Sequence, residues 1–151
     1  MTAPASATTL SIAPIGDADV ADVIALWQAC GLTRPWNDPA ADIALARRGP
    51  NSTVLIGRDG STIVATAMVG HDGHRGWVYY VAVDPDRRGQ GHGRAIMKAV
   101  EDWLRAADIP KLQLLVRRDN AKAGAFYQSI GYEEAETIVF AKWLDGRKPT
   151  A

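Results

Sequence analysis

Apolar residues recur along the chain in two patterns: continuous or alternating runs, which predict strands, and three- and four-residue spacings, which predict helices. Residues 78–83 form an unbroken apolar run rich in β-branched and aromatic side chains, which predicts a strand covered on both faces and central in its sheet. Asp84 and Pro85 end this strand, because proline cannot donate a hydrogen bond to a ladder. Beyond Gly91 the apolar residues return at helical spacing, so a helix begins within the glycine-rich turn.

The same patterns predict further strands and helices on either side of this junction. Asp59 and Gly60, between two apolar runs, are a strong hairpin signal. The glycine-bounded residues 70–76 predict a second hairpin loop. The predicted strands are 10–14, 52–57, 63–69, 112–116 and 138–144. The predicted helices run from Asp17 or Asp19 to Gly31, over 39–48, and from Asp119 or Asn120 to Gly131.

The composition indicates a single soluble domain. With 151 residues and 47% hydrophobic content, the chain is long enough to bury a core of its own. We expect this domain to span residues 10–144, with a disordered tail at 1–9 and a polar tail at 145–151. Residues 1–9 lack the features of a signal peptide. Seventeen basic residues balance seventeen acidic ones, which argues against a nucleic-acid partner. No apolar stretch has the length of a membrane span, and the lone Cys30 excludes an internal disulfide and indicates a cytoplasmic location.

The glycine-rich turn has the features of an anion-binding site. Gly89, Gly91 and Gly93 carry no side chains, so several backbone N–H groups can converge at the N-terminus of the following helix. The helix dipole and the neighbouring arginines favour a phosphate or pyrophosphate there. A Walker A loop is excluded because no lysine follows the glycines, and a dinucleotide-binding turn is excluded because Arg94 stands where its third glycine belongs. A tight turn with solvated arginines is the structural alternative.

Two motifs resemble those of one enzyme family. Residues 88–93 follow a hydrophobic strand and match the pattern Arg/Gln-x-x-Gly-x-Gly/Ala, and residues 120–132 match Asn-x-x-Ala-x-x-x-Tyr-x-x-x-Gly-Phe/Tyr. In this order the two motifs resemble the GCN5-related N-acetyltransferase (GNAT) family, and the loops at 34–39 and 73–76 resemble its small bacterial members of the YpeA type. The resemblance implies an α/β fold in which a central, splayed and mostly antiparallel sheet is flanked by helices.

The resemblance also implies a cosubstrate and the residues that bind it. In the family the first motif binds the pyrophosphate of acetyl-CoA through backbone amides, and strand edges exposed at the splay hold the pantetheine arm. No metal is implied, because the two histidines of residues 70–76 lack a convincing third ligand. The implied acetyl-CoA-binding residues are Val81, Ala82, Val83, Arg88, Gly89, Gln90, Gly91, His92, Gly93, Arg94, Asn120 and Tyr127.

The implied reaction is direct transfer of an acetyl group from acetyl-CoA to an amine of a small molecule or a peptide. We expect Tyr127 to protonate the departing thiolate, as the matching tyrosine does in many relatives. A core aromatic on an apolar helix face is the alternative role for Tyr127. An amine that is protonated at neutral pH must lose its proton, and Tyr79, Tyr80, His74 and Asp38 are the candidates for a relay.

The acceptor pocket is expected between the first two helices, where the family lines the acceptor side of its cleft. A capped turn, with Asp38 as the helix cap and Trp36 packed on the core, is the structural alternative. His74 is a candidate because we expect its loop to open near the cleft, with a plain hairpin loop as the alternative. The predicted acceptor residues are Arg34, Trp36, Asn37, Asp38, His74 and Tyr80.

Two other functions stay open. A non-catalytic acyl-CoA-binding sensor would share the anion site. Leu115 favours such a sensor, because relatives that acetylate ribosomal-protein N-termini carry a glutamate at this position. A nucleotide-binding module is the third candidate, although neither nucleotide loop pattern is satisfied. The family often dimerises, so the expected partners are an amine acceptor and a second copy of the chain.

Overall fold

The computed structural model describes residues 9–147. The tail predicted at 1–9 therefore lies outside the described residues except for Thr9, and so does the end of the predicted polar tail, residues 148–151. The described residues form two compact units, 9–114 and 115–147, and the single domain predicted over 10–144 stays a prediction. No helix among the described residues has both the length and the apolar character needed to cross a membrane.

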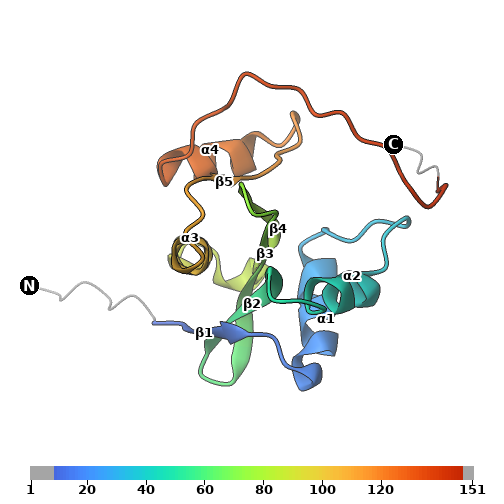
Figure 1. Ribbon diagram of the computed structural model, residues 1–151. Coiled ribbons are helices and arrows are strands. Elements are labelled where there is room, and N and C mark those ends of the chain that lie inside the picture. The colour runs from blue at the N-terminus through green and yellow to red at the C-terminus, as the bar shows by residue number, and fades with distance from the viewer. Residues whose placement is uncertain (1–8, 148–151) are drawn as a thin grey trace, which may run out of the picture. The chain divides into compact units, whose positions relative to one another are not determined.

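Five strands of the first unit form one mixed sheet (Figure 1). Their order in the sheet follows their order in the chain; the first three pairs are antiparallel and the last pair is parallel. This confirms the predicted α/β fold with a mostly antiparallel sheet. The strands are β1 (Ser11–Pro14), β2 (Ser52–Asp59), β3 (Thr62–His71), β4 (Gly76–Val83) and β5 (Leu112–Gln113).

Three details of the predicted strands are wrong. The middle strand is β3 and not β4, because a continuous apolar run shows that a strand is covered but not where in the sheet it lies. The prediction that β4 is covered on both faces fails at Tyr79, which is 48% exposed. The strand predicted over 112–116 ends at Gln113, because β5 pairs with β4 at only two positions.

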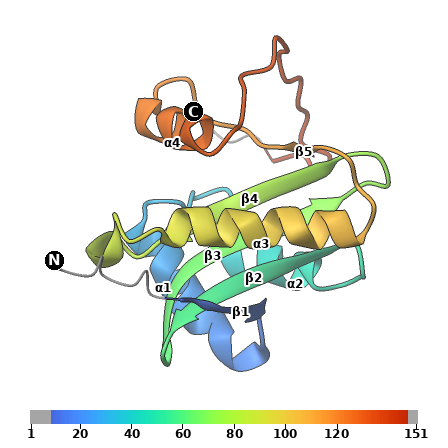
Figure 2. The same cartoon turned by 90° about the vertical axis from the view of Figure 1, so that its left-hand side faces the viewer.

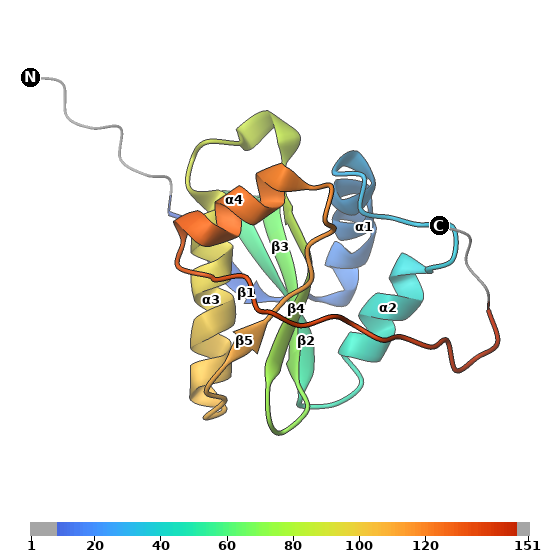
Figure 3. The same ribbon diagram turned by 90° about the horizontal axis from the view of Figure 1, so that it is seen from above.

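Helices cover both faces of this sheet, with α1 and α2 on one face and α3 on the other (Figures 1 and 3). Figure 2 shows α3 lying lengthwise along the strands that it covers. The first unit is therefore a three-layer structure, and its predicted helices are confirmed. The elements are η1 (Asp17–Asp19), α1 (Val20–Ala29), α2 (Pro39–Ala46), η2 (Pro85–Arg87) and α3 (His92–Ala106), where η marks a short 3-10 helix.

Each face of the sheet has its own apolar core. On the face of α1 and α2, the fully buried Trp27 and Val23 share a cluster with Ile43 of α2 and with Val54 and Ile56 of β2. On the other face, α3 buries one side of its surface, as its helical spacing of apolar residues predicts. The buried residues of α3 are His92, Ile96, Met97, Val100 and Leu104.

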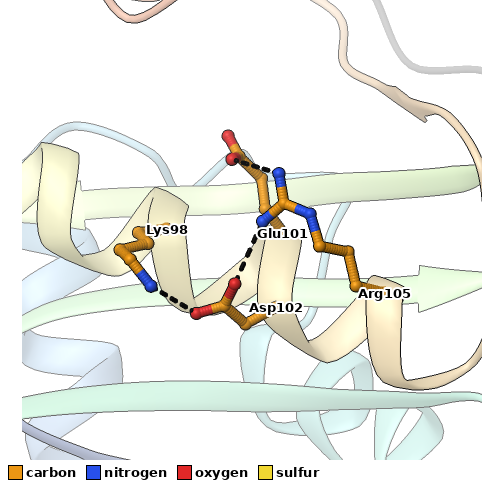
Figure 4. Close-up of polar contacts among 4 residues, drawn as sticks. All are labelled: Lys98, Glu101, Asp102 and Arg105. Atoms are coloured by element: carbon orange, nitrogen blue, oxygen red, sulfur yellow. Dashed lines mark hydrogen bonds and ion pairs between the residues drawn. The ribbon is translucent and has the colours of Figure 1, made fainter.

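The outward side of α3 is charged and solvated. Asp102 accepts hydrogen bonds from Lys98 Nζ at 2.7 Å and from Arg105 Nη1 at 3.0 Å, and Arg105 also reaches Glu101 at 3.4 Å (Figure 4). Exposed pairs at this spacing contribute only about 0.2–0.5 kcal/mol each. They support the helix locally, and the stability of α3 rests on its buried side.

In the second unit, residues 121–129 form α4 (Ala121–Ser129), and both of its predicted ends are confirmed. Asn120 caps the helix, its side-chain oxygen accepting from the Ala123 N–H at 3.1 Å. Gly131 ends the helix in the left-handed region with a φ of 102°, and the following Tyr132 N–H donates to the Tyr127 carbonyl at 3.0 Å.

The strand predicted over residues 138–144 is wrong, because this segment forms no strand in the structure. An apolar run becomes a strand only when a neighbouring strand supplies a hydrogen-bonded ladder, and no ladder in the described part of the chain includes these residues. The large apolar side chains that are exposed there are Ile138, Val139, Phe140, Trp143 and Leu144.

The start of β4 packs closely against α3. A Cβ added at Gly76 would lie 2.5 Å from Leu104 Cδ1. Gly76→Ala should therefore lower the free energy of unfolding by about 1–3 kcal/mol, measured by urea denaturation. Gly49→Ala is the control, because a Cβ there meets nothing within 4 Å, and it should change stability by less than about 0.5 kcal/mol. Equal effects of the two variants would contradict this close packing.

Candidate functional site

The turn between β4 and α3 is fixed to the sheet at two points. The Asp84 N–H donates to the Val64 carbonyl of β3 at 2.8 Å, and Asp84 Oδ1 accepts from the Asp86 N–H at 3.0 Å. Arg87 Nη1 lies 2.6 Å from Asp59 Oδ2 at the end of β2. Arg87 is therefore engaged in a structural ion pair, and the turn has a defined position above the sheet.

The glycines that follow leave the N-terminus of α3 open. Gly89 and Gly91 adopt left-handed conformations, with φ of 79° and 82°, which glycine enters without a steric penalty. A Cβ built at either position meets no atom within 4 Å, and no side chain caps the helix. The backbone N–H groups of the first turn of α3 thus lack intrahelical partners, and together with the helix dipole they favour an anion.

Arg88, Gln90 and Arg94 surround this turn as exposed residues, whereas His92 is buried. Neither ring nitrogen of His92 has a hydrogen-bond partner in the described part of the chain. The His92 side chain belongs to the buried side of α3. Of the predicted anion-binding residues, His92 therefore borders the turn with its backbone alone.

Cys30 is a packed thiol near the same turn. Its Sγ donates to the Val83 carbonyl at 3.2 Å, and the Arg88 guanidinium lies beside it. Burial raises the pKa of the Cys30 thiol more than the neighbouring Arg88 lowers it, so the thiol stays protonated at neutral pH. Cys30 packs against the apolar cluster on the face of α1 and α2.

A bulge interrupts β4 in its middle. Met68 pairs with Tyr79 and Thr66 pairs with Ala82, so two residues of β4, Tyr80 and Val81, lie opposite one residue of β3. Tyr80 has a φ of 52°, a left-handed conformation that is unfavourable for a bulky side chain. Such strain persists only where the surroundings hold it in place, and it is frequent at functional sites.

The Thr66 side chain holds the bulge in place. Its hydroxyl, fully buried, donates to the Tyr80 carbonyl at 3.0 Å and accepts from Trp27 Nε1 at 2.8 Å. One side chain of β3 therefore satisfies a carbonyl of the bulge and the indole N–H of α1. The sequence offered no signal for this contact, because the three residues are far apart in the chain.

The edge of β4 facing β5 is open over most of its length. β5 pairs with β4 only at Gly76 and Trp77, so residues 78–83 have no ladder partner on that side within the first unit. The ladder between β4 and β5 thus ends after two positions, and the predicted splay beyond it stays a prediction. Unpaired main-chain groups at a strand edge can bind an extended guest, and this edge ends at the glycine turn of α3.

On the face covered by α1 and α2, Tyr80 joins an aromatic ring and a carboxylate. Its ring stacks on Trp27 with centroids 3.8 Å apart and planes 6° apart. Its hydroxyl donates to Asp42 Oδ2 of α2 at 2.7 Å. Burial, the hydrogen bond to Asp42 and the charge of that carboxylate together raise the pKa of Tyr80 far above neutral pH. Tyr80 is therefore protonated at neutral pH.

The predicted acceptor residues between α1 and α2 are engaged in local structure. Asp38 caps α2, its Oδ1 accepting from the Ala40 and Ala41 N–H groups at 3.0 and 3.2 Å, as the structural alternative predicted. Arg34 donates to the Gly31 and Thr33 carbonyls. The same turn includes Trp36 and Asn37, which are both half-buried. The Asn37 N–H donates to the Arg34 carbonyl.

His74 lies in the β3–β4 loop, at the opposite end of β4 from the glycine turn. Four residues of β4, 76–79, lie between this loop and Tyr80, roughly 13 Å of strand at about 3.3 Å per residue. Asp72 Oδ1 accepts from the His74 and Arg75 N–H groups at 2.9 and 2.8 Å, which explains the hairpin loop. No three His, Cys, Asp or Glu side chains of residues 9–147 are grouped so that they could hold a metal ion.

In the second unit, Tyr127 belongs to an aromatic cluster. Its ring meets Phe126 and Tyr132 edge-on, with centroids 5.1 and 5.9 Å away. Burial raises the pKa of the Tyr127 hydroxyl, so it is protonated at neutral pH, which a general acid requires. Asn120, the other predicted residue of this motif, serves as the cap of α4.

The acetyltransferase (GNAT) family model matches residues 21–132, from α1 to the end of the second motif. The chain belongs to this family. A relative named acetyltransferase, from Yersinia pestis (strain Pestoides F), is 41% identical over 126 residues, which cover 83% of this chain and 89% of the relative. The family membership predicted from the two motifs is thus confirmed, and this GNAT protein is an acetyltransferase by family.

Solved structures show the same fold. A putative acetyltransferase from Agrobacterium tumefaciens superimposes with a TM-score of 0.75 at 22% identity, covering 88% of this chain and 99% of that chain. AAC(6')-Iy, solved with the bisubstrate analog CoA-S-monomethyl-acetylneamine, superimposes with a TM-score of 0.77 at 15% identity, covering 89% and 98%. At these identities the two structures establish the GNAT fold of the chain.

The hydroxyl that holds the bulge can be removed at nearly constant volume. Thr66→Val leaves the buried Trp27 N–H and the Tyr80 carbonyl without this partner, so the free energy of unfolding should fall by about 1–3 kcal/mol in urea denaturation. Thr62→Val, at an exposed position of the same strand, is the matched control and should have little effect. A Thr66→Val protein as stable as wild type would show that the hydroxyl does not hold the bulge.

Proposed function

We propose that this GNAT protein uses acetyl-CoA as its cosubstrate and transfers the acetyl group to an amine of a small molecule or peptide. One observation carries the proposal: the open edge of β4, residues 78–83, leads directly into the uncapped N-terminus of α3. Acetyl-CoA has a pantetheine arm with amide groups, and this arm ends in a pyrophosphate. The strand edge can bind the amides and the helix end can bind the pyrophosphate.

In this proposal the backbone of Val81, Ala82 and Val83 binds the pantetheine arm. The phosphates lie at residues 89–93, and the exposed side chains of Arg88 and Arg94 add positive charge. AAC(6')-Iy, whose fold the chain shares, has been solved in complex with CoA, which supports the choice of cosubstrate.

The transfer itself is a direct attack. The neutral amine forms a new bond to the acetyl carbonyl carbon, backbone N–H near Ala82 stabilises the negative charge on the carbonyl oxygen, and the carbon–sulfur bond breaks. The departing thiolate takes a proton from the Tyr127 hydroxyl, whose raised pKa keeps that proton in place until then. The attacking nitrogen releases its proton to solvent, because Tyr80 stays protonated, and solvent then restores the proton of Tyr127.

The anion site can be tested through Arg88. Arg88→Ala removes an exposed positive charge beside the turn and should weaken CoA binding by about five- to tenfold in isothermal titration calorimetry, with a smaller loss at high salt. Arg48→Ala is the matched control, an exposed arginine that follows α2, and should bind CoA like wild type. Equal affinities of the two variants would contradict a phosphate site at this turn.

The role of Tyr127 can be separated from packing by Tyr127→Phe, which keeps the ring and removes the hydroxyl. Loss of the general acid should lower kcat about a hundredfold or more while CoA affinity stays nearly unchanged. Tyr132→Phe is the matched control, because it belongs to the same aromatic cluster and the family pattern accepts either residue there. Undiminished turnover of Tyr127→Phe would remove Tyr127 from the mechanism.

The overall function is tested by measuring free-thiol release from acetyl-CoA with amines, amino acids, polyamines, aminoglycosides and peptide N-termini. Amine-dependent release together with CoA binding supports the enzyme. Tight binding of acetyl-CoA without release by any acceptor would instead support an acyl-CoA sensor.

A further inference from the structure

Asp42 differs from Asp19 and Asp59, two half-buried carboxylates of the first unit that form ion pairs. Asp19 pairs with Arg58, and Asp59 pairs with Arg87. Asp42 is buried to a similar degree but has no cationic partner among residues 9–147. Asp42 lies in the first turn of α2, where the helix dipole offsets part of a negative charge, but no side chain of these residues supplies a full counter-charge.

No described side chain in contact with Asp42 carries a positive charge; only the N-terminal end of α2 compensates its charge in part. Asp42 Oδ2 accepts the hydroxyl of Tyr80 at 2.7 Å, and that hydroxyl is a neutral donor because the pKa of Tyr80 is raised. The structure shows no hydrogen bond to the other carboxylate oxygen from the described residues. Asp42 therefore has both a fixed orientation and an oxygen free to accept from a cation.

The surroundings of Asp42 suit an ammonium group. The Tyr80 ring lies beside the carboxylate, and Trp27 covers one of its faces and fixes its plane. Tyr80 is nevertheless half-exposed, so part of it is available to a ligand. A carboxylate next to an aromatic ring is a combination that favours organic cations through charge and cation–π attraction.

The position of Asp42 decides which nitrogen it can bind. Tyr80 directly precedes residues 81–83, where the proposed function places the thioester. The length of a tyrosine side chain separates the Asp42 carboxylate from that backbone. An amine attacking the thioester is then beyond the direct reach of Asp42, and the carboxylate can only contact another group of the acceptor.

We propose that Asp42 binds a second cationic group of the acceptor, one that is distinct from the reacting amine. The acceptor class is therefore a compound with two basic groups, such as a diamine, a polyamine or a basic amino acid, rather than a monoamine. This assignment rests on the proposed acetyl transfer, and Asp42 acts in it as a specificity-determining residue.

The test compares cadaverine, pentylamine and δ-aminovalerate, which share a five-carbon chain and differ only in whether the far end is cationic, neutral or anionic. Wild-type protein should show a kcat/KM for cadaverine about tenfold or more above that for pentylamine, with δ-aminovalerate lowest. Asp42→Asn keeps the size of the side chain and an acceptor for the Tyr80 hydroxyl, and should bring the cadaverine-to-pentylamine ratio close to the statistical value that follows from the two equivalent amines of cadaverine. Asp22→Asn, an exposed position on α1, is the control and should keep the wild-type ratio.

A binding measurement separates this proposal from the proposed function. Cadaverine titrated into the CoA-saturated protein should bind about tenfold more tightly to wild type than to Asp42→Asn, whether or not turnover occurs. Such binding without acetylation of any amine would overturn the proposed transfer and leave the cation site standing. Two kinetic results would overturn the role of Asp42: equal kcat/KM values for cadaverine and pentylamine in the wild type, or a wild-type ratio of these values in Asp42→Asn. Equal affinity of the wild type and Asp42→Asn for cadaverine would overturn it as well.

Discussion

The site of this protein depends on one buried hydroxyl, that of Thr66. A bulge places an extra residue in β4, so the regular ladder to β3 cannot satisfy every main-chain group there. Thr66 donates to the Tyr80 carbonyl and accepts from the Trp27 indole, and so connects β3, β4 and α1 at one point. Leaving either of those buried groups unpaired would cost about 1–3 kcal/mol, which is a large part of the stability of a small domain.

The bulge divides β4 between two tasks. The side chain of Tyr80 turns to the face of α1, where it stacks on Trp27 and reaches Asp42, while the backbone of residues 81–83 lies on the open edge that leads to α3. The formal net charge of the chain is zero, yet exposed arginines lie at the end of α3, and Asp42, a carboxylate without a cationic side-chain partner in the described part of the chain, lies beside the bulge. This separation of charge matches an anionic cosubstrate and a cationic acceptor, in keeping with the proposed function.

Much of the fold was predictable because its signals are local. A glycine pattern after an apolar run predicted the start of α3, the Asp59 and Gly60 pair predicted the β2–β3 hairpin, and Asn120 and Gly131 predicted the ends of α4. Each of these depends on the conformational preferences of a few neighbouring residues. The strand predicted over 138–144 failed for the opposite reason, since a strand exists only through pairing with a segment elsewhere in the chain.

The sequence by itself determined the family, through two motifs, and the left-handed turn before α3, through glycines whose backbone conformation needs no distant partner. Only the tertiary structure decided the position of the bulge and the choice between two carboxylates of α2. Asp38 and Asp42 are one turn apart on that helix, yet Asp38 is engaged as its cap while Asp42 meets Tyr80, a residue 38 positions further along the chain. Contacts of this kind follow from the register of strands and the packing of helices on them, and local sequence patterns do not determine which distant side chains meet.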